Sequence, residues 1–327
     1  GRAMEIVHEK NQLKNFVEEA FKAAENNPIL IDKFINNAME VDVDAISDGK
    51  EVFVAGIMQH IEEAGIHSGD SACCLPPVAI KKELITEIKN QTKKLALALK
   101  VKGFMNVQYA IKNDEIYIIE VNPRASRTVP FVSKAKGIPL ANIASRVMTG
   151  EKLSKFNLVN KNKNIFAVKE AVFPFNKFPN VDVLLGPEMK STGEVMGMDK
   201  DFGLAYAKSQ ISSGNSLPTK GLAFISLKDK HKNEGINLAK KLVELNFTLC
   251  GTEGTANAIQ KNGIKCRKIN KVSGGSPHIV DVLNAKKIAL VINTGGGKRA
   301  YRILDSTSLR RATLINKVPY CTNMSTA

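Results

Sequence analysis

The sequence of 327 residues contains no tryptophan, and aromatic residues make up only 6% of it. Its five cysteines form no Cys-x-x-Cys pair, and no apolar run approaches the roughly 18 residues that span a bilayer. An odd cysteine count without such pairs argues against a zinc site and against a disulfide framework. Residues 1–5 do not form a signal peptide. We therefore expect a cytoplasmic globular protein with reduced cysteines.

Acidic residues are scarce beside basic ones. Lys and Arg number 47 against 32 Asp and Glu, which gives a net charge of +15. Such a charge first suggests nucleic acid as a partner. However, the lysines are scattered over expected helix faces, few aromatic residues lie among them, and no nucleic-acid-binding motif is recognisable. We favour a solvated, lysine-rich surface, which is also compatible with small phosphorylated ligands.

The first 150 residues predict an α+β domain with antiparallel hairpins. Apolar residues at helical spacing predict helices at 11–26, 80–100 and 139–149. Alternating residues predict strands at 41–45, 51–58, 104–111 and 116–121. Residues 59–79 are expected to form a polar loop. Residues 151–215 are less regular and end in a Ser/Gly/Asn linker, so they complete the first domain.

From Lys220 the pattern changes to a strict alternation of strands and helices. Strands are expected at 221–227, 247–250, 264–269 and 287–293. Helices are expected at 233–246, 255–262, 277–285 and 298–305. This alternation is typical of a parallel, doubly wound α/β sheet. We place the domain boundaries at 1–150, 151–215 and 216–327.

Oxygen-bearing side chains gather on the second predicted hairpin. Glu120 and Asn122 share one face of their strand because strand side chains alternate. With a three-residue loop at 113–115, Gln108 would lie directly opposite Glu120, and Asn106 opposite Asn122. One carboxylate with amide oxygens suits Mg²⁺, which binds through one or two carboxylates plus substrate phosphates. On spacing alone, a solvent-facing polar side of the hairpin is an equally good interpretation.

Two arginines, Arg124 and Arg127, follow this hairpin at once, and guanidinium groups suit phosphate oxygens. The run Glu-Val-Asn-Pro-Arg at 120–124, with Gln108 upstream, resembles the metal-binding hairpin of ATP-grasp enzymes. Other segments resemble the large subunit of carbamoyl-phosphate synthetase. These segments are residues 1–5, 40–45, 65–71, 174–179 and 185–189.

The resemblance covers nearly the whole chain and fits the second ATP-grasp half of that subunit, which a regulatory domain follows. It implies a partial ATP-grasp domain with an antiparallel sheet, then a Rossmann-like, methylglyoxal-synthase-like allosteric domain. The small lobe and its glycine-rich loop should precede Gly1, so we expect a fragment cut inside a domain and inactive by itself. Another ATP-grasp ligase is disfavoured because of the regulatory domain.

The resemblance also assigns roles. Gln108, Glu120 and Asn122 would hold Mg²⁺ or Mn²⁺ against the ATP phosphates, and Arg124 and Arg127 would hold phosphate or carbamate. The ATP-binding positions would be Lys33, Ile35, Glu40, Gly65, Ile66, His67, Ser68, Gln108 and Glu120. The implied reaction converts carbamate and ATP into carbamoyl phosphate and ADP, for pyrimidine and arginine biosynthesis. A glutaminase small subunit and a homo-oligomer of the full enzyme are implied as partners.

Three Gly/Thr-rich or Gly/Ser-rich loops follow strands of the second domain, at 251–255, 272–276 and 293–297. Loops at the carboxyl ends of parallel strands converge, and the helix N-termini that they open favour anions. One such loop would be plain turn chemistry, but three favour a phosphate site. By resemblance, a nucleotide monophosphate would bind there as an effector. The matching residues are Lys232, Thr252, Thr255, Lys271 and Asn293. Gly295 departs from the hydroxyl-bearing residue expected at its position.

A second effector, ornithine, is implied by a match to the positions that bind it in bacterial relatives. These are Glu62, Asp70, Glu170, Tyr320 and Thr322. Carboxylates around a diamino acid make electrostatic sense. An alternative function is a nucleotide-binding regulatory fragment without catalysis. Methylglyoxal synthase activity is disfavoured because Glu253 is the only acid in the crevice loops.

Overall fold

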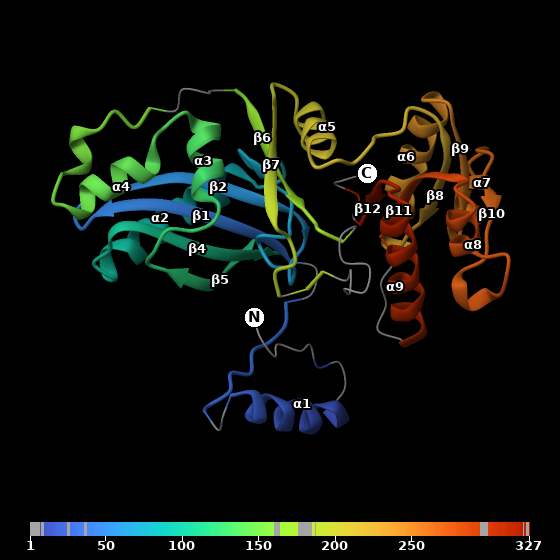
Figure 1. The fold of residues 1–327 in the computed structure, drawn as a ribbon, viewed down its shortest axis with the longest axis horizontal. Helices are drawn as coiled ribbons and strands as arrows, with labels where there is room; N and C mark the ends of the chain where they lie inside the picture. Colours follow the sequence, from blue (N-terminus) through green and yellow to red (C-terminus); the bar gives the residue numbers. More distant parts are fainter. Residues whose placement is uncertain are drawn as a thin grey trace. The chain divides into compact units, whose positions relative to one another are not determined.

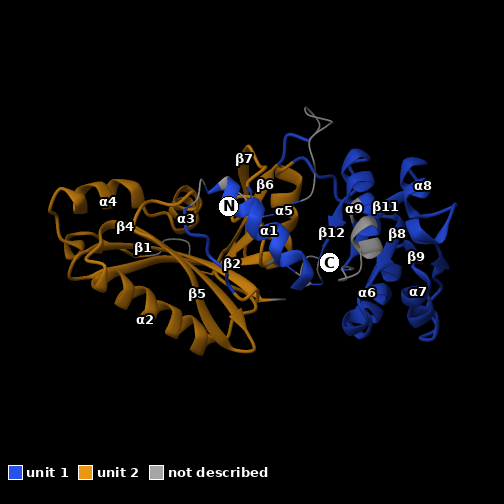
Figure 2. Cartoon of the chain, turned by 90° about the horizontal axis from the view of Figure 1, so that it is seen from below, with its two compact units in different colours: residues 1–32, 173–188, 214–327 blue, residues 33–172, 189–213 orange. Residues whose placement is uncertain are grey.

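The chain was analysed as a computed structural model that describes residues 7, 10–24, 27–35, 38–159, 164–175, 185–186, 188–294, 300–322, 324 and 327. It divides into two compact units (Figure 2). The unit of residues 33–172 and 189–213 contains an antiparallel sheet, and we call it the antiparallel unit. The unit of residues 1–32, 173–188 and 214–327 contains a parallel sheet, and we call it the parallel unit.

The antiparallel unit has a seven-stranded sheet with the order β5-β4-β1-β2-β3-β6-β7 (Figure 1). The strands are β1 Met39–Asp48, β2 Val52–Glu63, β3 Cys73–Leu75, β4 Lys102–Lys112, β5 Glu115–Asn122, β6 Phe166–Val172 and β7 Gly193–Asp199. Its helices are α2 Lys82–Ala98, α3 Val129–Lys136, α4 Leu140–Met148 and α5 Phe202–Ser212, with the 3-10 turn η1 Leu153–Lys155. The predicted antiparallel hairpins and the helices near 80–100 and 139–149 are confirmed.

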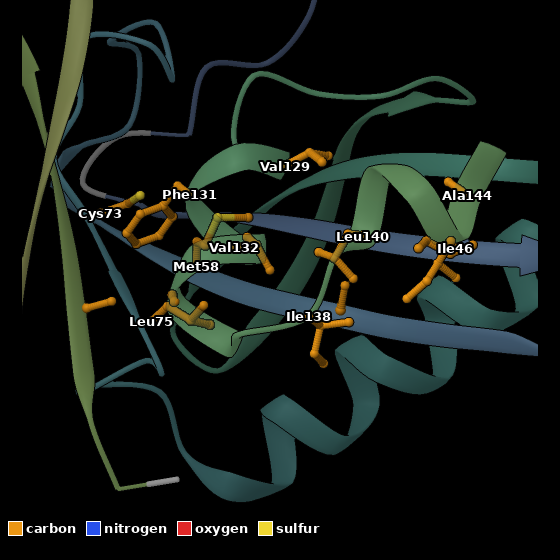
Figure 3. Close-up of a cluster of buried hydrophobic side chains, with 14 of the residues drawn as sticks. Ile46, Met58, Cys73, Leu75, Val129, Phe131, Val132, Ile138, Leu140 and Ala144 are labelled. Atoms are coloured by element: carbon orange, nitrogen blue, oxygen red, sulfur yellow. The ribbon is translucent and has the colours of Figure 1, made fainter. Parts of the chain in front are cut away.

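Opposite faces of this sheet are covered by different helices, because side chains alternate along each strand. Val41 and Val43 point toward α2 and pack with Ile88. Ile46 points the other way, into a cluster with side chains of α3 and α4 such as Val132 and Leu140 (Figure 3). Burial of each such aliphatic side chain contributes about 1.5–3 kcal/mol to stability. The polar residues of β1 share the α3 and α4 face with Ile46.

The prediction of a polar loop over 59–79 is wrong, because β2 continues to Glu63 and β3 lies at Cys73–Leu75. Some polar side chains in this segment are buried with hydrogen-bond partners inside the fold. Gln59 accepts hydrogen bonds from the backbone N–H groups of Val78 and Ala79, at 3.0 and 2.8 Å. The polar composition of this segment therefore led to a loop being predicted where β2 continues and β3 follows. Strands β6 and β7 and helices α3 and α5 were likewise not predicted.

The parallel unit has a five-stranded sheet with the order β10-β9-β8-β11-β12. Its strands are β8 Gly221–Ser226, β9 Phe247–Gly251, β10 Arg267–Lys268, β11 Ile288–Asn293 and β12 Tyr320–Cys321. Its helices are α1 Lys10–Ala23, α6 Lys232–Glu244, α7 Glu253–Gln260, α8 Ile279–Asn284 and α9 Ala300–Ile315, with 3-10 turns η2 Asp229–His231 and η3 Val272–Gly274. Side chains of α6 and α7 pack on one face of the sheet and those of α8 and α9 on the other. The predicted doubly wound parallel sheet is confirmed.

Two details of the prediction differ. The strand predicted at 264–269 is only Arg267–Lys268, and the helix predicted to end at 305 continues to Ile315. All five cysteines are free thiols. Within the described residues, no helix combines the length and the apolar character that crossing a membrane would need.

Candidate active site and effector site

The hairpin of β4 and β5 has the predicted pairing of Gln108 with Glu120, but its turn differs from the predicted one. Lys112 pairs with Glu115, so the turn contains two residues, Asn113 and Asp114, and the predicted three-residue loop is wrong. Both turn residues have positive φ, 51° and 64°, as a type I′ turn requires. A two-residue turn by itself would place Gln108 and Glu120 on opposite faces.

A register shift corrects this. Tyr109 pairs with Ile118, but the preceding residue, Gln108, pairs with Glu120, so β5 holds one extra residue between the two pairs. Such a β-bulge restores the alternation of faces. Gln108 lies opposite Glu120, and Asn106 lies opposite Asn122, as the sequence predicted.

Two polar rows therefore cross the strands β1, β4 and β5. One row consists of Asp42, Gln108 and Glu120, and the other of Asp44, Asn106 and Asn122. The β1 members are buried, whereas Glu120, on the edge strand, is exposed. Each row leads from the packed interior to an open edge, and the three predicted metal ligands share that face.

The donor chemistry of the rows fits Mg²⁺. Glu120 supplies a carboxylate, and Gln108 and Asn122 supply amide oxygens, which are hard ligands of the kind that Mg²⁺ uses together with substrate phosphates. In the described part of the chain, no three His, Cys, Asp or Glu side chains are grouped as a metal site. A cation held here would therefore combine the Glu120 carboxylate with amide oxygens and with phosphate.

Arg124 and Arg127 lie in the loop between β5 and α3, and both are exposed. The Arg124 backbone N–H donates to the Asn122 carbonyl at 2.8 Å, and its guanidinium donates to the Ala125 carbonyl at 3.1 Å. The Arg127 guanidinium contacts the sulfur of Met189. Both guanidinium groups thus follow the metal-ligand face directly along the chain, as the sequence indicated.

Glu40 and its surroundings include a histidine that sequence reasoning missed. His60 Nε2 lies 2.9 Å from Asp42 Oδ2, and its Nδ1 lies 3.9 Å from Glu40 Oε2. Burial lowers the pKa of His60, but the hydrogen bond and charge of Asp42 outweigh it, so the pKa is raised. Burial also raises the pKa of Glu40, which accepts a hydrogen bond from the Gly65 backbone N–H. Glu40 therefore reaches the predicted nucleotide loop.

That loop, residues 65–68, is fixed at its base. The buried Lys169 on β6 donates through Nζ to the Ser68 carbonyl at 2.9 Å. His67 Nδ1 accepts from the Gly69 backbone N–H at 3.0 Å, and burial lowers the pKa of His67. Lys33 and Ile35 precede β1 in an irregular segment, where the ring of Phe34 faces Gly65.

Two of the predicted ornithine carboxylates lie close to Lys169. Burial raises the pKa of both Glu62 and Glu170, and for Glu170 the charge of Glu62 adds to the effect. The third, Asp70, is buried and accepts from the backbone N–H groups of residues 190 and 191, each at 2.8 Å. Tyr320 and Thr322 belong to the parallel unit, so their part in this site stays a prediction.

In the parallel unit, a cavity of about 350 Å³ opens at the carboxyl ends of the strands. Its lining includes all five residues predicted for the nucleotide effector: Lys232, Thr252, Thr255, Lys271 and Asn293. Residues that sequence reasoning missed also line it, namely Ser226, Leu227, Lys228, Asp305 and Ser306. The strand order reverses at β8, and open α/β sheets bind ligands at such a switch point.

Hydrogen bonds hold the pocket's neutral polar groups in place. Thr255 Oγ1 accepts a hydrogen bond from the Leu227 backbone N–H at 3.0 Å. Thr252 Oγ1 lies 3.3 Å from Thr255 Oγ1. Asn293 donates to the Tyr320 hydroxyl at 3.0 Å. Lys232 Nζ pairs with Asp229 at 2.6 Å, near the start of α7. Gly295, which the sequence placed beside this site, lies outside the described residues.

Both parts of the chain match known protein families. Residues 1–156 match the family "Carbamoyl-phosphate synthase L chain, ATP binding domain", and residues 234–322 match the "MGS-like domain". A carbamoyl phosphate synthase large chain, C-terminal section, from Aquifex aeolicus is 50% identical over 99% of this chain and 63% of its own length. The carbamoyl phosphate synthase large chain of Pseudomonas putida is 52% identical over 98% of this chain and 30% of its own length.

Among solved structures, a biotin carboxylase complex from Campylobacter jejuni aligns with a TM-score of 0.51 and 16% identity, over 64% of this chain and 53% of its own. At this identity the likeness concerns the fold alone. The chain thus joins an ATP-grasp-type ATP-binding domain to an MGS-like domain. Over 98% to 99% of its length it is similar to carbamoyl phosphate synthase large chains, and it spans 30% to 63% of the length of the two relatives described above.

Proposed function

We propose that this chain takes part in the ATP-dependent phosphorylation of carbamate to carbamoyl phosphate, for pyrimidine and arginine biosynthesis. The observation that carries the proposal is the pair of polar rows, which place Gln108, Glu120 and Asn122 on one face. Two exposed arginines follow that face directly. This arrangement offers oxygen ligands and guanidinium groups where nucleotide phosphates would need them.

In the proposed reaction, a carbamate oxygen attacks the γ-phosphorus while the bond to the ADP oxygen breaks. A Mg²⁺ or Mn²⁺ ion held by Gln108, Glu120 and Asn122 would neutralise phosphate charge. Arg124 and Arg127 orient phosphate or carbamate oxygens, and Glu40 binds the ribose. The protein's contribution is positioning and charge stabilisation, which phosphoryl transfer chiefly requires.

The test is Glu120→Gln in the intact enzyme that contains this chain. ATP synthesis from carbamoyl phosphate and ADP should fall by at least about a hundredfold, the size of effect seen when one charge-stabilising group is removed. Bicarbonate-dependent ATP hydrolysis should survive, because the resemblance places it at a separate ATP site. Glu115→Gln, which is also exposed on β5, is the matched control. Normal ATP synthesis in Glu120→Gln would refute the metal site and favour a regulatory chain without catalysis.

We further propose that the parallel unit binds a nucleotide monophosphate as an allosteric effector. Its cavity is lined by three lysines together with two threonines and Asn293. Titration calorimetry with purine and pyrimidine monophosphates should detect binding to this chain. Thr252→Ala should weaken binding about 2- to 12-fold, the equivalent of one neutral hydrogen bond. The exposed Thr248→Ala on β9 should leave it unchanged. An absence of binding at millimolar concentrations would refute the effector role.

Glu62 and Glu170 support ornithine as a second effector, because a diamino acid would neutralise carboxylates that burial makes costly to ionise. Asp70 is already engaged by two backbone N–H groups, so its role is to hold the loop next to the site. A glutaminase small subunit as nitrogen donor and a homo-oligomer of the full enzyme complete the proposal, on the strength of the family.

A further inference from the structure

We propose that Asp44 is a positioning residue that fixes the backbone on both sides of Arg127. The inference rests on the role proposed above for Arg127 in holding phosphate or carbamate. Asp44 lies on β1 with its side chain fully buried, whereas Arg127 lies exposed in the loop before α3. The two residues are distant in sequence and are connected through the neighbours of Arg127.

The carboxylate of Asp44 is bound by both of those neighbours. Ser126 Oγ donates to Asp44 Oδ1 at 2.7 Å, and Thr128 Oγ1 donates to Oδ2 at 2.6 Å. The two hydroxyl oxygens lie 2.7 Å from each other. Asn106 Nδ2 also donates to Oδ1, at 2.9 Å. The residues before and after Arg127 are thus tied to one buried group in the sheet.

The oxygen atoms of Asp44, Ser126 and Thr128 are linked in a ring of three contacts, and each contact requires one hydrogen to be a hydrogen bond. Three contacts link Asp44, Ser126 and Thr128, but the two hydroxyls supply only two hydrogens. A third hydrogen on residue 44 would complete the ring. An asparagine amide can supply that hydrogen and still accept one hydroxyl, whereas alanine can do neither. The ring therefore predicts that asparagine preserves the loop and alanine releases it.

The described partners of Asp44 are neutral donors, so its role differs from that of a structural ion pair. A buried carboxylate is costly unless its hydrogen bonds are made. Here two of the three hydrogen bonds to the carboxylate come from the loop that carries Arg127, and the third comes from Asn106 on β4. The backbone of Arg127 is held between two anchored residues. The position from which its side chain extends is therefore fixed. Catalytic groups displaced by about 1 Å can lose about a hundredfold in rate.

The experiment measures ATP synthesis from carbamoyl phosphate and ADP in the intact enzyme, with KM determined for each substrate. In Asp44→Ala, the KM for carbamoyl phosphate should rise by about ten- to a hundredfold, as expected when a binding group is misplaced. The KM for ADP should stay within about twofold, since the ring contains no ATP-site residue. Asp44→Asn should restore both constants. Unchanged constants in Asp44→Ala, or an equal loss in Asp44→Asn, would overturn the proposal.

Thr128→Val serves if Asp44→Ala does not fold, because it keeps the shape of the side chain and removes one hydroxyl from the ring. It should raise the KM for carbamoyl phosphate in the same direction, and an unchanged KM would overturn the proposal. Thr92→Val is the matched control: its buried hydroxyl bonds Tyr109 at 2.9 Å, away from the loop. That control should lower the melting temperature without changing either KM, which separates positioning from general stability.

Arg127→Ala distinguishes failure of this inference from failure of the proposed function. If Arg127→Ala leaves ATP synthesis unchanged, the proposed role of Arg127 is wrong and the inference falls with it. If Arg127→Ala abolishes ATP synthesis while Asp44→Ala is normal, the function stands and only the positioning role of Asp44 is overturned.

Discussion

In the antiparallel unit some charged side chains are buried on the faces of the sheet, whereas the described charged side chains around the cavity of the parallel unit are not buried. Asp42, Asp44 and Lys169 are buried on strand faces and depend on partners inside the fold. Around the cavity of the parallel unit the buried polar residues are neutral, and Lys271 is exposed. Chemistry and stability should therefore be coupled in the first unit and nearly independent in the second.

The largest expected difference concerns two lysines. Lys169→Met should lower the free energy of unfolding by about 3–5 kcal/mol, because it leaves buried carboxylates without their cation. Lys232→Met should cost less than about 1 kcal/mol, since Lys232 pairs with an exposed aspartate. Urea unfolding of the chain measures both. Adding Glu170→Gln to Lys169→Met should recover part of the loss. Equal costs for the two lysines would remove the distinction between the units.

An intermediate effect is expected from pH. Burial raises the pKa of Glu170 to about 8 from an ordinary value of 4.5, so the folded state holds this proton more tightly than the unfolded state. Its contribution to stability is fully present below pH 4.5 and is lost as the pH rises through about 8. Glu170→Gln should reduce the fall in stability between these pH values by at least about 1.4 kcal/mol, the equivalent of one pKa unit.

Denaturation curves at several pH values test this, with Glu194→Gln on β7, which is exposed, as the control. The control should follow the unmodified protein. A pH profile of Glu170→Gln that coincides with both would show that the carboxyl ionises freely in the folded state.

The smallest expected effect lies in the parallel unit. Lys271→Ala should weaken binding of a nucleotide monophosphate by about two- to fivefold at low salt, as for one exposed charge. At about 1 M salt the difference should nearly vanish, because the screening length falls to about 3 Å. Titration calorimetry at two salt concentrations is the measurement, and the melting temperature without ligand should be unchanged. A loss that persists at high salt would indicate that the lysine is enclosed by the bound nucleotide.

Local patterns predicted much of the fold. The strict alternation of strands and helices after Lys220 predicted the doubly wound sheet. Strands and helices could be told apart there because their apolar residues recur with different periods. The face shared by Glu120 and Asn122 also followed from local geometry alone. The turn did not, because loop length and register are linked: a two-residue turn with a bulge yields the same register as a three-residue loop.

The sequence by itself determined which residue types are near one another along the chain: the ligand-bearing hairpin, the arginines after it, and the loops that follow parallel strands. Only the tertiary structure decided which polar residues are buried. His60 is joined to Asp42 across 18 residues, and Asp44 to Thr128 across 84. Whether a polar side chain can leave water depends on a partner that the fold brings to it, and no local period encodes such a partner.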